Sequence, residues 1–535
     1  MRYGFVIDQT TCIGCHACTV ACKTEHNVPL GVNRTWVKYV ESGTWPDTRR
    51  SFSVMRCNHC TEAPCVTICP TRALYKRHDG IVDFDTSRCI GCKSCMQACP
   101  YDALYIDPGD HTAQKCNYCA HRTDIGLQPA CVVVCPEQAI VAGDLDDPAT
   151  RIARLVAADD LSQRAVEQGT RPNLWYKGAS EANLDPLGAV DSGDGGIWQD
   201  PAGSWLAVDL SPGAVEAPGP KVVHEPATPG RVVYNSRHPM PWGWRVSSYF
   251  LTKGIAAGVI LALAIAALSG MDLTSEWARW GAPLVALVFL AVTGWLLVAD
   301  LKRPERFYYL LTKGNTSSWL VRGAWILAAY AATLSLWVLV GIFENMGVFN
   351  GDALIPWLLG FSVPLALATA GYTAFLFGQA EARDLWQSPI LLWHMLAGAF
   401  AVGGGASALL TLTTRSICVD GIQATCDAEQ GFGAFAWTLL GGVLILGLVE
   451  LTELVAPHPT RNMAEGAHHL TRGSYAREWW IGGILLGVVV AASFAAVGIA
   501  TGSLISPALG GIAAMAGIWF ADNAYVKAGQ SVPLS

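Results

Sequence analysis

Two stretches of similar design decide the fold of the first half of the chain, CIGCHACTVAC at Cys12–Cys22 and CIGCKSCMQACP at Cys89–Pro100. In each, two, two and three residues separate four successive cysteines. Three thiolates with this spacing can wrap one face of an iron–sulfur cube, while the fourth begins a segment that reaches a neighbouring cube. Gly14 and Gly91 let the loops approach a cluster closely. The pattern therefore predicts iron–sulfur clusters.

Two further groups complete the set, CNHCTEAPCVTICP at Cys57–Pro70 and a longer group that begins with CNYC at Cys116 and ends at Cys135. Structural zinc sites usually pair two C-x2-C units across a gap, and disulfides do not explain sixteen cysteines in four compact groups. We therefore expect four [4Fe–4S] clusters. The predicted ligands are Cys12, Cys15, Cys18, Cys22, Cys57, Cys60, Cys65, Cys69, Cys89, Cys92, Cys95, Cys99, Cys116, Cys119, Cys131 and Cys135.

The composition shows that a second, different part follows. The 535 residues are 52% hydrophobic and 15% charged, against ~25% charged residues in a typical soluble domain. The long uncharged runs lie after residue 250, whereas sixteen of the eighteen cysteines lie before residue 136. This excludes one soluble domain and a disordered chain. The net charge of −7 gives no reason to expect a nucleic-acid partner.

Eight segments are long and apolar enough to cross a bilayer. The last two share a run without charge, Trp479–Ala521, which we divide at residues 501–503. The predicted spans are 246–269, 281–300, 320–343, 354–378, 389–413, 432–453, 480–500 and 503–523.

The predicted fold class is an α+β double ferredoxin-like iron–sulfur domain followed by an all-α transmembrane bundle of eight helices. Its boundaries are 1–176 for the iron–sulfur domain, 177–245 for an irregular Gly- and Pro-rich linker, 246–525 for the membrane domain and 526–535 for a tail.

The first half resembles the four-cluster electron-transfer subunits of the complex iron–sulfur molybdoenzymes, the family of the dimethyl sulfoxide and polysulfide reductases. GTRPNLWY at Gly169–Tyr176 also resembles the end of such subunits. The resemblance implies a separate catalytic partner with a molybdenum or tungsten bis-pterin cofactor. It also implies that the groups pair crosswise. The implied ligand sets are Cys12, Cys15, Cys18 and Cys135; Cys22, Cys116, Cys119 and Cys131; Cys57, Cys60, Cys65 and Cys99; and Cys69, Cys89, Cys92 and Cys95.

The second half resembles the NrfD/PsrC family of quinone-interacting membrane anchors, which implies a menaquinone or ubiquinone site among polar residues of helices one, two and four. The motifs are YFLTKGIAAG (Tyr249–Gly258), DLKRPERFYYLL (Asp300–Leu311), SSWLVRGAWIL (Ser317–Leu327), GYTAFLFG (Gly371–Gly378) and LWQSP (Leu385–Pro389).

Ionisable groups within spans are costly, so they are functional candidates. The candidates for the quinone site are Tyr249, Lys253, Asp300, Tyr372, Arg383 and His394. Five of them have a plain alternative role: headgroup contact for Lys253, an ion pair or helix cap for Asp300, an interfacial position for Tyr372, a topology charge for Arg383 and an interhelical hydrogen bond for His394.

Charge distribution predicts the orientation. Loops expected on the iron–sulfur side carry nine Lys or Arg, against Arg279 and Arg415 on the other side, which predicts a cytoplasmic iron–sulfur domain on the inner membrane. The opening MRYGFVIDQTTC has no apolar signal region. Cys418 and Cys426 share an outer loop, where they are either a disulfide or two free thiols.

We find no nucleophile motif, phosphate loop or dinucleotide fingerprint, so substrate chemistry is expected on the partner. The expected function is electron transfer, in either direction, between that partner and the quinone pool. Three alternatives stay open: an energy-converting complex like alternative complex III, a donor to a multihaem nitrite reductase, and an anchor or redox sensor without quinone. The first needs a proton path through the membrane, for which the candidate residues are Glu344, Glu450 and Glu453.

Overall fold

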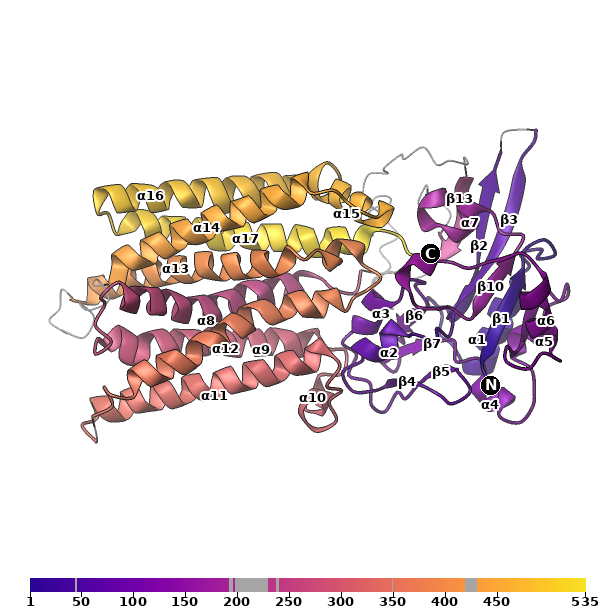
Figure 1. Cartoon of the computed structure of the whole chain (residues 1–535), viewed down its shortest axis with the longest axis horizontal. Coiled ribbons are helices and arrows are strands. Elements are labelled where there is room, and N and C mark those ends of the chain that lie inside the picture. The colour runs from indigo at the N-terminus through magenta and orange to yellow at the C-terminus, as the bar shows by residue number, and fades with distance from the viewer. Residues whose placement is uncertain (44–45, 192–195, 198–229, 237–239, 349, 419–430) are drawn as a thin grey trace.

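The computed structural model describes residues 1–43, 46–191, 196–197, 230–236, 240–348, 350–418 and 431–535. A helical bundle and a smaller α+β domain lie end to end, and the bundle helices run along the long axis of the molecule (Figure 1). Cys426 and the side chain of Cys418 lie outside the described residues, so both expectations for this pair, a disulfide or two free thiols, stay untested.

The α+β domain is organised around a four-stranded sheet of order β8-β1-β10-β9. In β1, Phe5 and Ile7 are fully buried and pack against the segments that carry the cysteines. β1 runs parallel to β10 and antiparallel to β8, with Phe5 opposite both Leu174 and Ala142. The strands are β1 (Tyr3–Asp8), β8 (Ile140–Asp144), β9 (Leu161–Ser162) and β10 (Leu174–Lys177).

Two short hairpins and several short helices carry the cysteine groups. The first and third groups form the same turn, because His16 and Lys93, each directly after the second cysteine of its group, have φ of 61° and 64°. The hairpins are β4 (Leu74–Lys76) with β5 (Val82–Phe84) and β6 (Leu104–Ile106) with β7 (Ala113–Lys115). The helices are α1 (Ala17–His26), α2 (Pro64–Ile68), α3 (Ser94–Ala98), α4 (Ala120–Thr123), α5 (Ala130–Val133) and α6 (Arg151–Ala158).

A second sheet corrects the predicted linker 177–245. β13 (Gly230–Ser236) pairs antiparallel with β2 (Thr35–Ser42), which pairs with β3 (Arg49–Arg56). Val232 packs with Val40 in a small core. The Gly- and Pro-rich composition hid a strand of seven residues, whose partner lies far earlier in the chain. The remaining short elements are α7 (Glu181–Leu184), β11 (Val190–Asp191) and β12 (Gly196–Ile197).

The described part of the bundle contains eight helices long and apolar enough to cross a membrane, as the sequence predicted. Small residues set the spacing of its central helices: Gly258 of α8 lies against Gly403 of α13, and Gly405 lies against Gly511 of α17, with backbone in contact at both places. The spans are α8 (Trp244–Leu268), α9 (Ala282–Asp300) with the turn before it from Trp277, α11 (Trp319–Asn345), α12 (Ile355–Gly378), α13 (Leu391–Cys418), α14 (Phe432–Val455), Glu478–Thr501 ending in α16 (Ala491–Thr501), and α17 (Ile505–Ser531).

The last helix corrects the predicted tail 526–535. α17 continues to Ser531, and the residues after it contact the α+β domain: the Leu534 carbonyl accepts a bond from Arg164 Nη2 (2.7 Å) and the Ser535 carbonyl one from Asn235 Nδ2 (3.3 Å). Contacts with distant parts of the chain stabilise this polar segment as a helix, and the local sequence pattern does not predict them. The short helices α10 (Tyr309–Thr312) and α15 (Arg461–Thr471) also lie at the end of the bundle that faces the α+β domain (Figure 1).

Candidate functional site

Three of the four implied cysteine sets each line a cavity of their own. Nine of the twelve cysteines that line these cavities are buried. Cys15, at the end away from the membrane bundle, is the exposed one. The lining sets are Cys12, Cys15, Cys18 and Cys135; Cys22, Cys116, Cys119 and Cys131; and Cys57, Cys60, Cys65 and Cys99.

The fourth set receives backbone amides. The amide of Leu74 donates to Cys69 Sγ (3.4 Å), and those of Gly91 and Ala113 donate to Cys89 Sγ (3.4 and 3.3 Å). Thiolate donors surrounded by amides of this kind suit an iron–sulfur cluster. Burial raises the pKa of Cys92 to about 12, so cluster binding must displace the proton of this thiol.

The four sets follow one another in a row. Burial is the main cause that raises the pKa of Cys18 to about 11, and the thiol of Cys131 in the next set raises it further. In the same way, the Cys57 thiol of the third set adds to the raised pKa of Cys116 in the second, and the Cys65 thiol of the third adds to that of Cys95 in the fourth. The neighbouring pairs are Cys18 with Cys131, Cys116 with Cys57, and Cys65 with Cys95.

The fourth set ends the row at the bundle, whose residues bond to its backbone carbonyls. Trp242 Nε1 donates to the Cys92 carbonyl (3.3 Å), Arg306 Nη1 to that of Cys89 (2.8 Å) and Asn315 Nδ2 to that of Cys69 (3.0 Å). These contacts fix the last cysteine set against the ends of α8, α9 and α11.

Two of the six predicted quinone-site residues lie in this interface and outside the cavity described below. Asp300 Oδ2 forms an ion pair with Lys93 Nζ at 2.7 Å. Arg383 is buried, donates from Nε to Gln97 Oε1 (2.9 Å) and donates from Nη1 to the Val532 carbonyl (2.9 Å). Their partners belong to the α+β domain and the end of α17, so the interface accounts for both charges.

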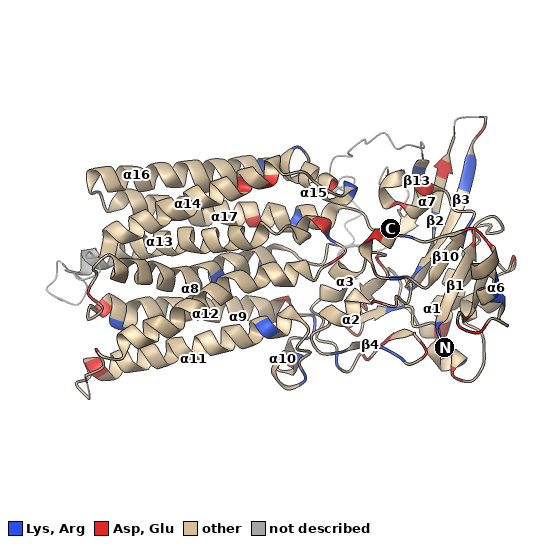
Figure 2. Cartoon of the chain, viewed as in Figure 1, with Lys and Arg blue, Asp and Glu red and all other residues tan. Residues whose placement is uncertain are grey.

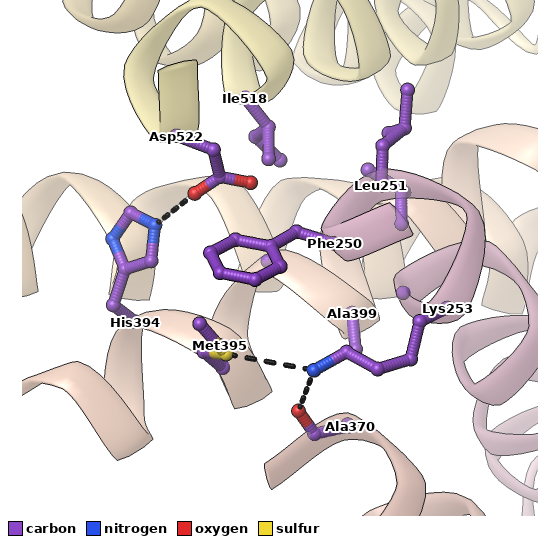
Figure 3. Close-up of a pocket in the computed structure, with 12 residues that line it drawn as sticks. Phe250, Leu251, Lys253, Ala370, His394, Met395, Ala399, Ile518 and Asp522 are labelled. Atoms are coloured by element: carbon purple, nitrogen blue, oxygen red, sulfur yellow. Dashed lines mark hydrogen bonds and ion pairs between the residues drawn. The ribbon is translucent and has the colours of Figure 1, made fainter. Parts of the chain in front are cut away.

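A cavity lies within the bundle, between α8, α12, α13 and α17 (Figure 3). Lys253 enters it from α8 with a side chain only 2% exposed. Its Nζ donates to the Ala370 carbonyl (2.9 Å), to Thr373 Oγ1 (2.6 Å) and weakly to Met395 Sδ (3.6 Å). The side chain therefore turns inward rather than toward a headgroup, and in the described residues it forms no ion pair.

The two predicted tyrosines stand beside this ammonium group. Tyr372 and Tyr249 are buried, and their ring centroids lie 5.0 and 5.9 Å from Lys253 Nζ. Tyr372 also packs against Gly323 of α11, where a side chain larger than hydrogen would collide with its ring. The structure thus brings together three of the six predicted residues, Tyr249, Lys253 and Tyr372.

On the far side of the cavity, His394 Nε2 lies 3.0 Å from Asp522 Oδ1 (Figure 3). Sequence reasoning identified His394 but missed Asp522, although a carboxylate at the end of the eighth apolar run was a usable signal. Glu450 of α14 is buried, and neither of its oxygens has a hydrogen-bond partner in the part of the chain described. Glu453, one turn further, accepts a bond from Ser388 Oγ (2.8 Å).

The cysteine loops and the bundle define a class of protein: an iron–sulfur electron-transfer domain joined to a membrane anchor. Family comparisons give the same result. The family described as 4Fe-4S dicluster domain matches residues 11–74 and 49–145, and the family described as Polysulphide reductase, NrfD matches residues 232–522. The chain belongs to the NrfD family and carries the iron–sulfur part on the same polypeptide.

Curated relatives cover the iron–sulfur half. A tetrathionate reductase subunit of Salmonella typhimurium is 40% identical over 203 residues, which are 37% of this chain and 80% of the relative. The iron–sulfur subunit ArrB of the arsenate respiratory reductase of a Shewanella species is 35% identical over 226 residues, 33% of this chain and 96% of the relative. Protein NrfC of Escherichia coli is 41% identical over 179 residues, 33% and 80% of the two chains.

Proposed function

We propose that this chain conducts electrons through four [4Fe–4S] clusters between a molybdenum or tungsten bis-pterin catalytic subunit and the membrane quinone pool. The observation that carries the proposal is the continuous arrangement of the sites. Four cysteine sets lie in a row, the bundle binds the carbonyls of the last set, and a cavity with a buried ammonium group lies among the same helices. The iron–sulfur relatives from reductases support the same function.

We propose as cluster ligands the four crosswise cysteine sets. A bound [4Fe–4S] cluster supplies a one-electron carrier, and the chain supplies its thiolates, its amide donors and a dry environment. The three cavities and the amide contacts at Cys69 and Cys89 support this assignment.

We propose that the bundle cavity binds the quinone head. Phe250, Met395 and Ile518 give it apolar walls for a ring. Lys253 can donate a hydrogen bond to a ring carbonyl, and the His394–Asp522 pair can hold or release a proton at the opposite side. Tyr249 and Tyr372 position the ammonium group. Asp300 and Arg383 instead hold the α+β domain against the bundle.

The end of the row away from the membrane suits the catalytic partner. Ile13, which lines the same cavity as the exposed Cys15, is 54% exposed, and Val20 of α1 and Val133 of α5 are 61% and 64% exposed on two helices that contact each other. Exposed apolar groups gathered beside a redox site favour a docking surface. A partner there would lie beside the first ligand set.

We propose that the iron–sulfur domain faces the cytoplasm, from the excess of basic residues at its end of the bundle (Figure 2). Four of the nine basic residues counted there also bind the α+β domain, which is a second reason for their position. They are Arg303, Arg306, Arg383 and Arg461.

The test is purification of the complex from its membrane in mild detergent, with metal analysis and identification of the co-purifying chains. We expect about sixteen irons per chain, a molybdenum or tungsten subunit, and clusters whose reduction by a quinol analogue is blocked by a quinone-site inhibitor. Clusters that do not respond to the quinol analogue would contradict the quinone proposal. A cytochrome partner without molybdenum or tungsten would contradict the catalytic-partner proposal.

A further inference from the structure

Arg56 is a buried cation that the proposed function leaves without a role. It ends β3, directly before Cys57, and its side chain is 1% exposed. Nη1 donates to Cys131 Sγ at 3.1 Å, and the guanidinium stacks over the ring of Phe5 with 4.6 Å between Cζ and the ring centroid. The side chain lines the cavity of the second ligand set.

The guanidinium, which borders that cavity, keeps unused donors. Nε and Nη2 of Arg56 are buried and have no hydrogen-bond partner among the described residues. Arg164, a buried arginine of the same domain, differs, because its three nitrogens bond to the Leu184 carbonyl (3.1 Å), the Leu534 carbonyl (2.7 Å) and Met55 Sδ (3.3 Å). A buried donor left unpaired is costly, so the free donors of Arg56 point to an acceptor in the cavity.

The charge of Arg56 needs a counter-charge as well. A guanidinium stays protonated in proteins, and burying its charge is costly unless the group is paired with an opposite charge or fully hydrogen-bonded. Within the described residues Arg56 forms no ion pair with a carboxylate. The anions that face it are the thiolates of Cys131 and Cys116 in the second ligand set, and of Cys18 in the first.

We propose that Arg56 is the fixed counter-ion of the second [4Fe–4S] cluster and raises its reduction potential. The inference rests on the proposed ligand set Cys22, Cys116, Cys119 and Cys131. Reduction adds one electron and one unit of negative charge to a cluster that four thiolates already make anionic, while no bond forms or breaks. A positive charge in contact with Cys131 stabilises the reduced form more than the oxidised form. Arg56 is thus a positioning residue, because its charge acts on the cluster through Cys131 and sets the reduction potential of the second cluster in the row.

The experiment compares Arg56→Gln and Arg56→Lys with the wild-type complex, and uses Arg164→Gln as the control for loss of a buried arginine. Iron is counted, and each cluster is titrated by potentiometry followed by electron paramagnetic resonance. In Arg56→Gln we expect the reduction equilibrium constant of one cluster to fall on the order of tenfold, a shift of about 59 mV for a one-electron couple. Arg56→Lys and Arg164→Gln should keep that potential.

The results separate an effect of the positive charge at position 56 from an effect of the shape of its side chain. If Arg56→Gln loses four irons while Arg56→Lys keeps all of them and the wild-type potential, the positive charge is required to hold the cluster, which supports the proposal. Unchanged potentials in a fully loaded Arg56→Gln overturn it, as does Arg56→Lys behaving like Arg56→Gln. A wild-type complex with fewer than four clusters contradicts the proposed function instead, so the two failures are distinguishable.

Discussion

The α+β domain and the membrane bundle each bury a cation without a carboxylate partner in the described residues, and they accommodate it differently. Arg56 faces cysteine thiols, with one nitrogen on Cys131 Sγ. Lys253 faces neutral groups: a carbonyl, a hydroxyl, a thioether and the rings of Tyr249 and Tyr372. In the proposed function, the anions of a bound cluster neutralise the first cation. The second exchanges its weak contact with Met395 Sδ for a hydrogen bond to a quinone that binds and leaves.

The largest expected effect comes from removing the anion that faces Arg56. In Cys131→Ala the second cluster loses a ligand, and Arg56 loses the sulfur to which its Nη1 donates. We expect iron to fall from about sixteen to about twelve atoms per chain, with electron transfer along the row near background. The matched control is Cys418→Ala, a cysteine outside the four groups. A fully loaded Cys131→Ala would show that this thiol is not a ligand and would remove one half of the comparison.

The other half is tested at Lys253. Lys253→Met keeps the length of the side chain and removes the donor, so we expect quinone-linked turnover to fall about 10- to 100-fold, the value of a hydrogen bond from a charged group. Iron content and cluster potentials should stay unchanged. Arg245→Gln is the control on the same helix, because Arg245 is exposed and its Nη1 bonds to the Ala299 carbonyl (3.0 Å) outside the cavity. Wild-type turnover in Lys253→Met would exclude this lysine from the quinone site.

The two regions also differ in how far the sequence alone predicted them. In the first three groups successive cysteines are three to five positions apart, so this local spacing predicted the loops, and the dicluster families match them. The cavity depends on residues from four helices, spread from Lys253 to Asp522, and their proximity is set by glycine contacts between α8, α13 and α17. Hydropathy predicted the eight spans but not which polar residues would meet.

The features that the sequence did not reveal have one physical cause, which is contact between the halves. Asp300 and Arg383, whose place in the quinone site stays a prediction, have their partners Lys93 and Gln97 in the cysteine domain. The sequence did not predict β13 for the same reason, because a strand that pairs with a distant strand can form without a strong local strand-forming pattern. Fusing two domains into one chain creates an interface, and its residues resemble functional residues in the sequence of either half.

A third buried cation sharpens the comparison, because Lys93 does have a carboxylate partner. Its side chain is 5% exposed and that of Asp300 17%. Breaking a mostly buried pair leaves one charge uncompensated, so Lys93→Gln should lower the free energy of unfolding by about 3 kcal/mol. In a double-mutant cycle with Asp300→Asn, denaturation in detergent should give a coupling energy of about 1–3 kcal/mol. Additive effects of the two substitutions would show that the pair does not join the domains energetically.

The smallest effect is expected where a cation and a carboxylate meet near water. Arg77 binds Asp124, whose side chain is 50% exposed, and also Asp79 at 3.0 Å. The hydrogen bond from Arg77 holds the pKa of Asp124 below its usual value. The contribution of this pair to stability is therefore present above the unfolded-state pKa and is lost as the pH falls through the lowered value.

In Asp124→Asn, Asp79 still compensates Arg77 and water screens what remains, so we expect a loss below about 1 kcal/mol at pH 7, and none at a pH where Asp124 is protonated. Denaturation of Asp124→Asn and wild type at both pH values measures this. A loss as large as that of Lys93→Gln would mean that burial does not decide how strongly a cation depends on its partner. The contrast between Arg56 and Lys253 would then need another explanation, because it assumes that a buried charge must be matched inside the protein.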